Sequence, residues 1–319
     1  MTEILPVPPP FRSGFCALLG EPNVGKSTLA NALTQFKVAI ISSKPQTTRN
    51  AIKAIYNDDD SQIVFVDTPG VMVPEDRLNE CLVTNALDSL EGADVVCHLV
   101  EAAKPRPLPP TGAAALDRVK KPMLLVVNKS DLLPGFMDGA SDEDLRKRFH
   151  PPFPLERYRD IVFISAANNI GVGKLLDKVK ALMPLGEPMY DREQLTDRDM
   201  RFLVSEVVRE KVLENAEQEI PYAVAAVTET FQENPGRKHL IRVVLFVEQE
   251  SQKAILIGRN GEKLHKIGAE SRPAIEEICD HPVFLELWVK VRKNWRKKDE
   301  SLREFGYGVT KKKPRKRRR

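Results

Sequence analysis

The 319-residue sequence has few cysteines and no long apolar run, and each lack excludes a class of protein. Its four cysteines, Cys16, Cys81, Cys97 and Cys279, form no C-x-x-C pair, which argues against a disulfide framework or a zinc site. No apolar run approaches the ~18 residues that a membrane-spanning helix needs. Prolines at positions 6, 8, 9 and 10 interrupt the first apolar residues, which argues against a signal peptide. The sequence therefore favours a protein of the reducing cytoplasm.

Charge is distributed unevenly along the chain. The net charge is +4, but residues 286–319 hold 15 lysines and arginines against 4 acidic residues, so the rest of the chain carries −7. Such a basic end predicts contact with a polyanion, although a solvated tail would have the same composition. We expect residues 1–13 to be a flexible segment and residues 308–319 to be a basic, disordered tail.

The first half of the chain alternates between short apolar strands and helical patterns. Nearly continuous apolar runs are typical of parallel strands covered on both faces. Such strands are predicted at Phe15–Leu19, Ile63–Val66, Val95–Val100, Met123–Val127 and Ile161–Ile164, with a helix at Lys26–Phe36. The alternation predicts a doubly wound α/β domain over residues 14–186, followed by a polar linker at 187–199.

The second half predicts a smaller α+β domain over residues 200–307. Its elements are a helix, two strands, two short helices around a glycine turn, a third helix and a last strand. The predicted ranges are Met200–Ala216, Tyr222–Thr230, Leu240–Val247, Ser251–Leu256, Glu262–Ile267, Arg272–Cys279 and Val283–Val291. Because Trp288 lies in an apolar strand, we expect it to belong to the core rather than to form a platform for base stacking.

A phosphate-binding loop follows the first predicted strand. The sequence G-E-P-N-V-G-K-S matches G-x-x-x-x-G-K-[ST] between a strand and a helix, the context that this motif requires. Backbone N–H groups would surround the phosphates, the Lys26 ammonium would pair with the β- and γ-phosphates, and the Ser27 hydroxyl would bind Mg²⁺. The nucleotide contacts predicted here are Gly20, Glu21, Pro22, Asn23, Val24, Gly25, Lys26, Ser27 and Thr28.

The base is predicted to be guanine. The sequence N-K-S-D follows the strand Met123–Val127, at the ligand-binding edge of such a sheet. The Asp131 carboxylate would accept hydrogen bonds from guanine N1–H and the exocyclic amine, which adenine cannot supply together. Asn128 would donate a hydrogen bond to an acceptor on the base and brace the loops. The Lys129 stem would lie along the base, and a backbone N–H at Ser165-Ala166 would reach guanine O6.

Two further segments are predicted to sense the γ-phosphate. After the strand Ile63–Val66 come Asp67, Thr68, Pro69 and Gly70. Asp67 would hold Mg²⁺ and the Gly70 N–H would contact the γ-phosphate. In the polar stretch 42–49, Thr48, with Thr47 as second choice, would close over Mg²⁺. Loss of the phosphate would release both segments.

These motifs resemble the Era-like branch of the translation-factor-related P-loop GTPases. Val71 occupies the position where Ras-type enzymes have a water-orienting glutamine, so hydrolysis must use another device and intrinsic turnover should be slow. The resemblance implies that K⁺ bound through Asn23 assists; the alternative is that Asn23 only caps the loop. The predicted catalytic residues are Asn23, Lys26, Thr48 and Gly70.

A G-x-x-G turn in the second half predicts RNA binding. In KH domains such a turn clamps a nucleic-acid backbone beside an apolar groove. The element order is that of a type II KH domain, and the runs around Gly258 and Trp288 resemble the KH segment of the Era family. The predicted RNA contacts are Lys253, Ile257, Gly258, Arg259, Asn260, Gly261 and Lys263.

The resemblance covers residues 15–307 and implies a GTP/GDP switch that uses Mg²⁺. It implies binding to the 3′ end of small-subunit (16S) ribosomal RNA, a role in assembling and maturing that subunit, and no DNA target. It also implies peripheral association with the inner face of the cell membrane, for which the sequence contains no anchor. An alternative, suggested by Val71, is an RNA-binding scaffold that barely hydrolyses GTP. A GTPase with two G domains is disfavoured because the sequence has one P-loop.

Overall fold

The structure is a computed structural model that describes residues 10–137 and 139–308. The basic tail from residue 309 and the first nine residues lie outside this range. The chain forms two compact units. The first contains the described residues up to 39 together with 51–71 and 87–198, and the second contains 40–50, 72–86 and the described residues from 199 onward.

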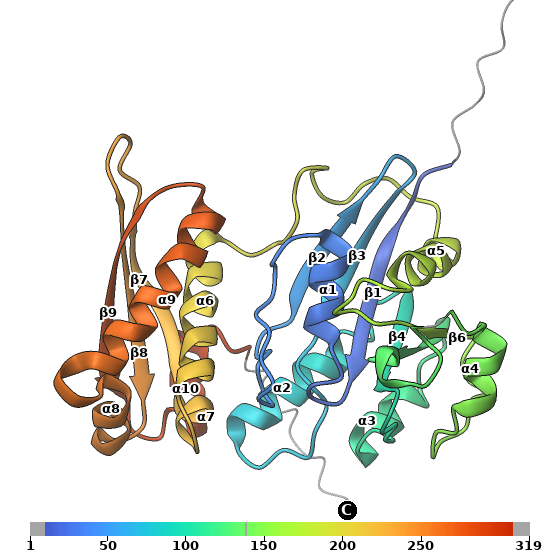
Figure 1. Ribbon diagram of the computed structural model, residues 1–319, viewed down its shortest axis with the longest axis horizontal. Coiled ribbons are helices and arrows are strands. Elements are labelled where there is room, and N and C mark those ends of the chain that lie inside the picture. The colour runs from blue at the N-terminus through green and yellow to red at the C-terminus, as the bar shows by residue number, and fades with distance from the viewer. Residues whose placement is uncertain (1–9, 138, 309–319) are drawn as a thin grey trace, which may run out of the picture. The chain divides into compact units, whose positions relative to one another are not determined.

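The first unit is built on a six-stranded sheet with the order β2-β3-β1-β4-β5-β6 (Figure 1). Its strands are β1 (Arg12–Gly20), β2 (Ile52–Asn57), β3 (Ser61–Asp67), β4 (Val95–Glu101), β5 (Met123–Asn128) and β6 (Asp160–Phe163). All neighbouring pairs are parallel except β2 with β3. The central strands are almost wholly buried, as their continuous apolar sequence requires.

The helices of the first half of the chain lie between successive strands of this sheet, except the last, which follows β6, and the α/β prediction is confirmed. They are α1 (Lys26–Thr34), α2 (Arg77–Asp88, whose last two residues belong to this unit), α3 (Pro110–Leu116), α4 (Asp142–Arg148) and α5 (Val172–Leu182). Two details of the prediction were wrong. Strand β2 was missed because its sequence, I-K-A-I-Y-N, mixes polar and apolar residues. Helix α1 ends before Phe36 because Gln35 adopts a left-handed conformation with φ of 52°.

The second unit has a three-stranded sheet with the order β7-β8-β9. Its elements are α6 (Met200–Asn215), α7 (Ile220–Ala223), β7 (Ala225–Gln232), β8 (His239–Val247), α8 (Glu250–Ile257), α9 (Glu262–Cys279), β9 (Val283–Val291) and α10 (Asp299–Glu304). Strands β7 and β8 are antiparallel, whereas β8 and β9 are parallel. Helices α6 and α9 lie beside each other against this sheet (Figure 1).

The prediction of two separate helices, Glu262–Ile267 and Arg272–Cys279, was wrong, because both ranges belong to the single helix α9. It runs without interruption through Pro273, even though proline removes one intrahelical hydrogen bond. Ile267, Ser271 and Ile275 recur every four residues and are all buried, so one helical face is held in the core. The Ser271 hydroxyl also donates a 2.7 Å hydrogen bond to the carbonyl of Ile267. Packing of this face outweighs the local effect of the proline.

Candidate functional site

The phosphate-binding loop turns sharply between β1 and α1. Asn23 and Gly25 both have left-handed backbones, with φ of 63° and 94°. A Cβ atom on Gly25 would stand 2.2 Å from Nδ2 of Asn128, so no larger residue fits here without displacing that side chain. The glycine lets the loop approach Asn128 at the end of β5 closely and begin α1 with its N–H groups facing the loop.

Lys26 turns its ammonium group back onto the loop. Its Nζ donates hydrogen bonds to the carbonyls of Glu21 at 2.8 Å and Gly20 at 3.2 Å. Burial lowers the pKa of Lys26 to about 8, and the charges of Asp67 and Glu21 oppose this shift. Phosphate oxygens carry full charge, so they are stronger acceptors than these carbonyls and would compete for the ammonium.

The two residues predicted to hold magnesium from the first unit lie together. The Ser27 hydroxyl donates a 2.7 Å hydrogen bond to Oδ2 of Asp67, although 40 residues separate them. A hydroxyl and a carboxylate are oxygen ligands of the kind that Mg²⁺ prefers, so the donor set fits that ion. The neighbouring Thr68 is fixed by a 2.7 Å hydrogen bond from its hydroxyl to the carbonyl of Leu18.

Gly70 and Val71 lie directly against the phosphate-binding loop. The Val71 N–H donates a 3.0 Å hydrogen bond to the carbonyl of Gly20. A Cβ atom on Gly70 would stand 2.6 Å from the backbone nitrogen of Pro22. The side chain of Val71 is completely buried. A buried aliphatic group cannot orient a water molecule, so this position contributes packing.

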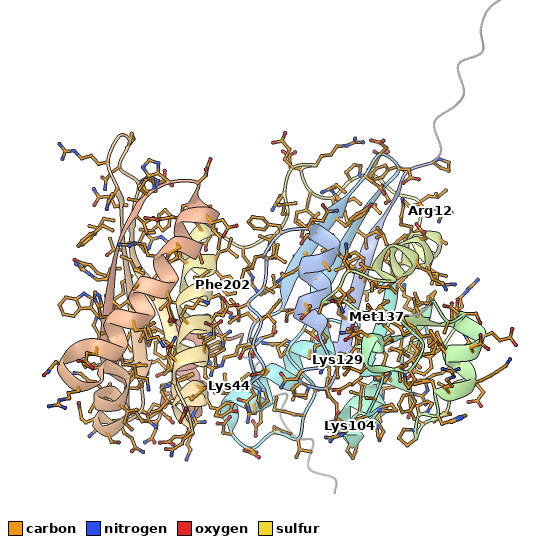
Figure 2. The ribbon with its side chains drawn as sticks, in the orientation of Figure 1. Arg12, Lys44, Lys104, Lys129, Met137 and Phe202 are labelled. Atoms are coloured by element: carbon orange, nitrogen blue, oxygen red, sulfur yellow. The ribbon has the colours of Figure 1, made fainter. Side chains whose placement is uncertain are left out.

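Asn128 joins the loops that are predicted to hold the nucleotide. Its Nδ2 donates to the carbonyl of Val24 at 2.8 Å, and its Oδ1 accepts from the N–H of Ala166 at 3.0 Å. Lys129, with φ of 59°, forms a 3.0 Å ion pair with Glu101 (Figure 2). Asp131 follows in a short 3₁₀ turn that spans Ser130–Leu132. The predicted base-binding residues thus share one edge of the sheet.

Thr48 belongs to the second unit, in segment 40–50. On one side of it, the Thr47 hydroxyl donates to the carbonyl of Lys44 at 2.6 Å, and Lys44 donates to the carbonyls of Leu213 and Ala216 at the end of α6 (Figure 2). On its other side, Arg49 is buried. The attachment of segment 40–50 to the second unit through the neighbours of Thr48 was not predicted.

Arg49 is held by distant parts of the second unit. Its guanidinium donates to the carbonyls of Pro221, Tyr222 and Val224 at 2.6–3.1 Å. It lies 5.8 Å from the ring centre of Trp295 and 5.9 Å from that of Tyr307. No local sequence pattern marks these partners, because an arginine in a polar stretch is ordinarily solvated.

The G-x-x-G turn connects α8 to α9. Gly258, Asn260 and Gly261 all have left-handed φ values, of 77°, 51° and 83°. A Cβ atom on Gly258 would stand 2.7 Å from Cβ of Lys263, so the turn is tight at this point. Arg259 and Asn260 are exposed at its tip. The backbone is therefore accessible to a ligand, as a nucleic-acid clamp requires.

A cavity of about 470 Å³ lies beside this turn. Apolar side chains from α9 and β9 form much of its wall, and Lys238 and Arg272 supply positive charge. The lining residues are Lys238, Gly261, Leu264, His265, Gly268, Ala269, Arg272, Val283, Phe284, Leu285 and Leu287. Of the predicted RNA contacts only Gly261 is among them, so sequence reasoning missed the strand side of this groove.

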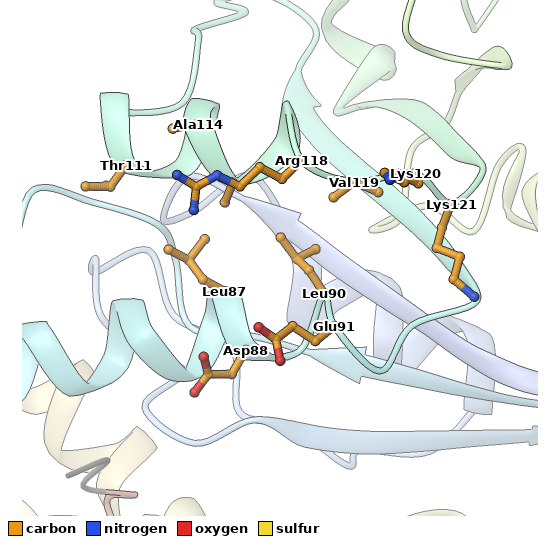
Figure 3. Close-up of a pocket in the computed structure, with 11 residues that line it drawn as sticks. Leu87, Asp88, Leu90, Glu91, Thr111, Ala114, Arg118, Val119, Lys120 and Lys121 are labelled. Carbon is orange, nitrogen blue, oxygen red and sulfur yellow. The ribbon is translucent and has the colours of Figure 1, made fainter. Parts of the chain in front are cut away.

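A second cavity, of about 640 Å³, lies in the first unit between the end of α2 and α3 (Figure 3). Leu87 and Leu90 face Arg118 across it, and Asp88 and Glu91 lie at one rim. None of the residues predicted to bind nucleotide or RNA lines this cavity.

Comparisons with known proteins match each half of the chain to a family. Residues 15–129 match the family described as 50S ribosome-binding GTPase, and residues 219–296 match the KH domain family. The GTPase Era of Geotalea daltonii is 43% identical over 298 residues, which cover 93% of this chain and 98% of the relative. The chain belongs to the Era family of GTPases. The GTPase Era of Carboxydothermus hydrogenoformans is 40% identical over 300 residues.

Two solved Era structures have the same fold as this chain. Aquifex aeolicus Era bound to GDP·AlF4⁻ superposes with a TM-score of 0.83 at 33% identity, covering 94% of this chain and all of that one. An Era structure in complex with MgGDPNP and nucleotides 1506–1542 of 16S ribosomal RNA gives a TM-score of 0.84, also at 33% identity and the same coverage. The predicted order of an α/β GTPase fold followed by a KH fold is confirmed.

Proposed function

We propose that this chain is a GTP-hydrolysing switch that binds the 3′ end of 16S ribosomal RNA and acts in assembly of the small ribosomal subunit. The observation that carries the proposal is the joint presence of the Ser27–Asp67 pair beside the phosphate-binding loop and a basic-rimmed groove beside a G-x-x-G turn. Residues 14–186 would form the GTPase domain and residues 200–307 the KH domain, joined by the linker 187–199. The Era relatives support this assignment.

On the GTPase side, each residue would act through the contacts described above. The Lys26 ammonium would exchange its hydrogen bonds to the carbonyls of Gly20 and Glu21 for contacts with the β- and γ-phosphates. Ser27, Asp67 and Thr48 would hold Mg²⁺, which, when bound, neutralises charge on the phosphate oxygens. Asp131 would read guanine, and Asn128 would keep the base-binding and phosphate-binding loops together.

Hydrolysis would proceed without a glutamine after Gly70, because Val71 is aliphatic and buried. We propose that K⁺ bound through Asn23 assists hydrolysis in its place. The turnover of GTP should then be faster in K⁺ than in Na⁺, and Asn23→Ala should abolish that difference. Equal turnover in both ions would assign Asn23 to capping the loop.

The proposed location is the cytoplasm, with peripheral contact at the inner face of the membrane as the point to be tested. Within the described residues, no helix is long and apolar enough to span a bilayer. Fractionation of cells expressing the chain would distinguish a purely cytoplasmic location from peripheral membrane contact. Release of the chain from membranes by high salt would indicate a peripheral, electrostatic contact.

Binding of a labelled RNA that carries the 16S 3′ end tests the function as a whole. Affinity should be higher with a GTP analogue than with GDP, and the double variant Gly258→Asp, Gly261→Asp should lose it while GTP turnover persists. Gly139→Asp is the matched control, because Gly139 also has a left-handed φ, of 80°, but lies in an exposed loop of the first unit. Equal affinity in both nucleotide states would contradict a switch.

A further inference from the structure

Strand β9 carries two exposed aromatic side chains. Phe284 is 55% exposed and Trp288 is 53% exposed, which contradicts the prediction that Trp288 belongs to the core. The odd-numbered residues of β9, from Val283 to Val291, pack into the core of the second unit. Because side chains alternate along a strand, Phe284 and Trp288 lie on the opposite face of the sheet.

The C-terminal segment of the described chain covers one end of that outer face. Phe246 stacks on Phe305 with their ring centres 4.7 Å apart, and it packs against the cluster that contains Trp295 and Tyr307. The other end has no such cover among the described residues. It presents Arg242, Phe284, Glu286 and Trp288, which we name the outer aromatic patch.

Neighbouring charges hold the indole of Trp288 in place. The Arg242 guanidinium lies 5.8 Å from the centre of the Trp288 ring and forms a 2.7 Å ion pair with Glu286. This arrangement orients the ring by a cation–π contact while about half of the residue stays open to solvent. An exposed aromatic ring with a fixed orientation is suited to stacking on another planar group.

The outer aromatic patch is continuous with the groove beside the G-x-x-G turn. Phe284 also borders the cavity of about 470 Å³ that is lined by Gly261, Leu264 and Arg272. Phe284 and Trp288 are four residues apart on one strand, which corresponds to about 13 Å. A chain that leaves the groove past Phe284 would therefore reach Trp288 along the same strand.

We propose that Phe284 and Trp288 stack on bases of the single-stranded RNA that continues beyond the KH groove. The inference rests on the proposed RNA-binding function and extends it to a second surface. A KH groove holds about four nucleotides, so a longer RNA must continue over adjoining protein. Aromatic side chains on the face of a sheet stack bases in other RNA-binding domains, and such stacking tolerates any sequence. The patch would add affinity and length dependence rather than base specificity.

RNAs of two lengths distinguish binding in the groove from binding at the outer aromatic patch. The short RNA contains only the nucleotides that fill the groove, about four. The longer RNAs carry an oligo(U) extension at the 5′ or the 3′ end. Trp288→Ala should weaken binding of one extended RNA by about 5- to 140-fold, the range expected for loss of one stacked base. Binding of the short RNA should not change, and Trp288→Phe should restore most of the loss.

Tryptophan fluorescence gives an independent readout. The chain has two tryptophans, and Trp295 is 0% exposed, so iodide should quench Trp288 selectively. The extended RNA should protect this emission from iodide or quench it directly, and the short RNA should leave it accessible. Trp288→Phe should remove the iodide-sensitive signal.

The controls separate failure of this inference from failure of the proposed function. Leu185→Ala removes a 62% exposed apolar side chain from the first unit and should not alter RNA affinity. If wild-type protein binds neither RNA, the proposed function fails. If it binds the extended RNA and Trp288→Ala binds equally well, the patch has no role in RNA binding and the inference is overturned. A self-association that Trp288→Ala abolishes, with RNA affinity unchanged, would instead assign the patch to a second copy of the chain.

Discussion

Arg49 donates a 2.6 Å hydrogen bond to the carbonyl oxygen of Val224, 175 residues further along the chain. Arg49 is 1% exposed, and its guanidinium also donates hydrogen bonds to the carbonyls of Pro221 and Tyr222. A buried cation is stabilised by such carbonyl dipoles and by aromatic rings. Arg49, the last charged residue of segment 40–50, therefore holds this segment in the second unit.

We expect Arg49→Ala to lower the free energy of unfolding of the second unit by about 2–5 kcal/mol, because it leaves several buried carbonyls without donors. Both tryptophans, Trp288 and Trp295, lie in this unit, so urea unfolding followed by tryptophan fluorescence reports on it. Arg159→Ala, at an exposed arginine of the first unit, should leave the transition unchanged. An unchanged midpoint for Arg49→Ala would show that water can replace its hydrogen bonds.

Elements whose signals are local can be predicted from the sequence. The P-loop and the parallel strands of the α/β sheet follow from short motifs and contiguous apolar runs, and Ser27 lies next to Asp67 because both lie at the carboxyl ends of the adjacent parallel strands β1 and β3. The anchoring of Arg49 could not be predicted, because its partners lie 172 to 258 residues away. The residues next to Arg49 in the sequence do not indicate its contacts with partners so far along the chain.

The errors in the second half have a similar cause. The run L-E-L-W-V-K-V alternates as a strand should, but sequence alone does not say that β9 is an edge strand with one open face. Trp288 is exposed because it lies on that open face. Pro273 likewise suggests a helix boundary, whereas the buried face of α9 maintains the helix. In both cases tertiary packing overrides the local pattern.

Gly25→Ala should abolish nucleotide binding. The new methyl group would stand 2.2 Å from Nδ2 of Asn128, at a residue whose φ of 94° already disfavours a side chain. Gly173→Ala is the matched control, because nothing lies within 4 Å of that position and it lies in α5. The control should retain affinity and stabilise the fold by about 0.4–1 kcal/mol. Titration with a fluorescent GTP analogue measures both variants, and normal affinity in Gly25→Ala would contradict the described loop geometry.

Asp131→Asn should shift the base preference from guanine to xanthine. The carboxylate is proposed to accept from N1–H and the exocyclic amine of guanine; an amide presents a donor, which suits the carbonyl that xanthine has in place of that amine. Competition between GTP and XTP for the protein measures the change. Asp177→Asn, at an exposed position in α5, should keep the preference for GTP. Retained GTP selectivity in Asp131→Asn would remove this residue from base recognition.

His98 should make the fold sensitive to mild acid. The ring is buried in β4, with Nδ1 2.6 Å from the Tyr158 hydroxyl, and burial lowers the pKa of His98 to about 4, aided by the charges of Arg157 and Lys26. The unfolded chain binds this proton below about pH 6.5, whereas the folded chain does so only near pH 4. Between these values the unfolded state binds more protons, so stability falls as the pH is lowered.

The loss of stability at low pH can be isolated by comparison with His98→Gln, which keeps a polar group near Tyr158 but does not titrate. Between pH 7 and pH 4, the wild-type protein should lose up to about 3 kcal/mol more free energy of unfolding than the variant. Urea unfolding of both proteins followed by far-ultraviolet circular dichroism, repeated across this pH range, measures the difference. Because carboxylates titrate alike in both proteins, parallel curves would mean that His98 becomes protonated in the folded state at its ordinary pKa.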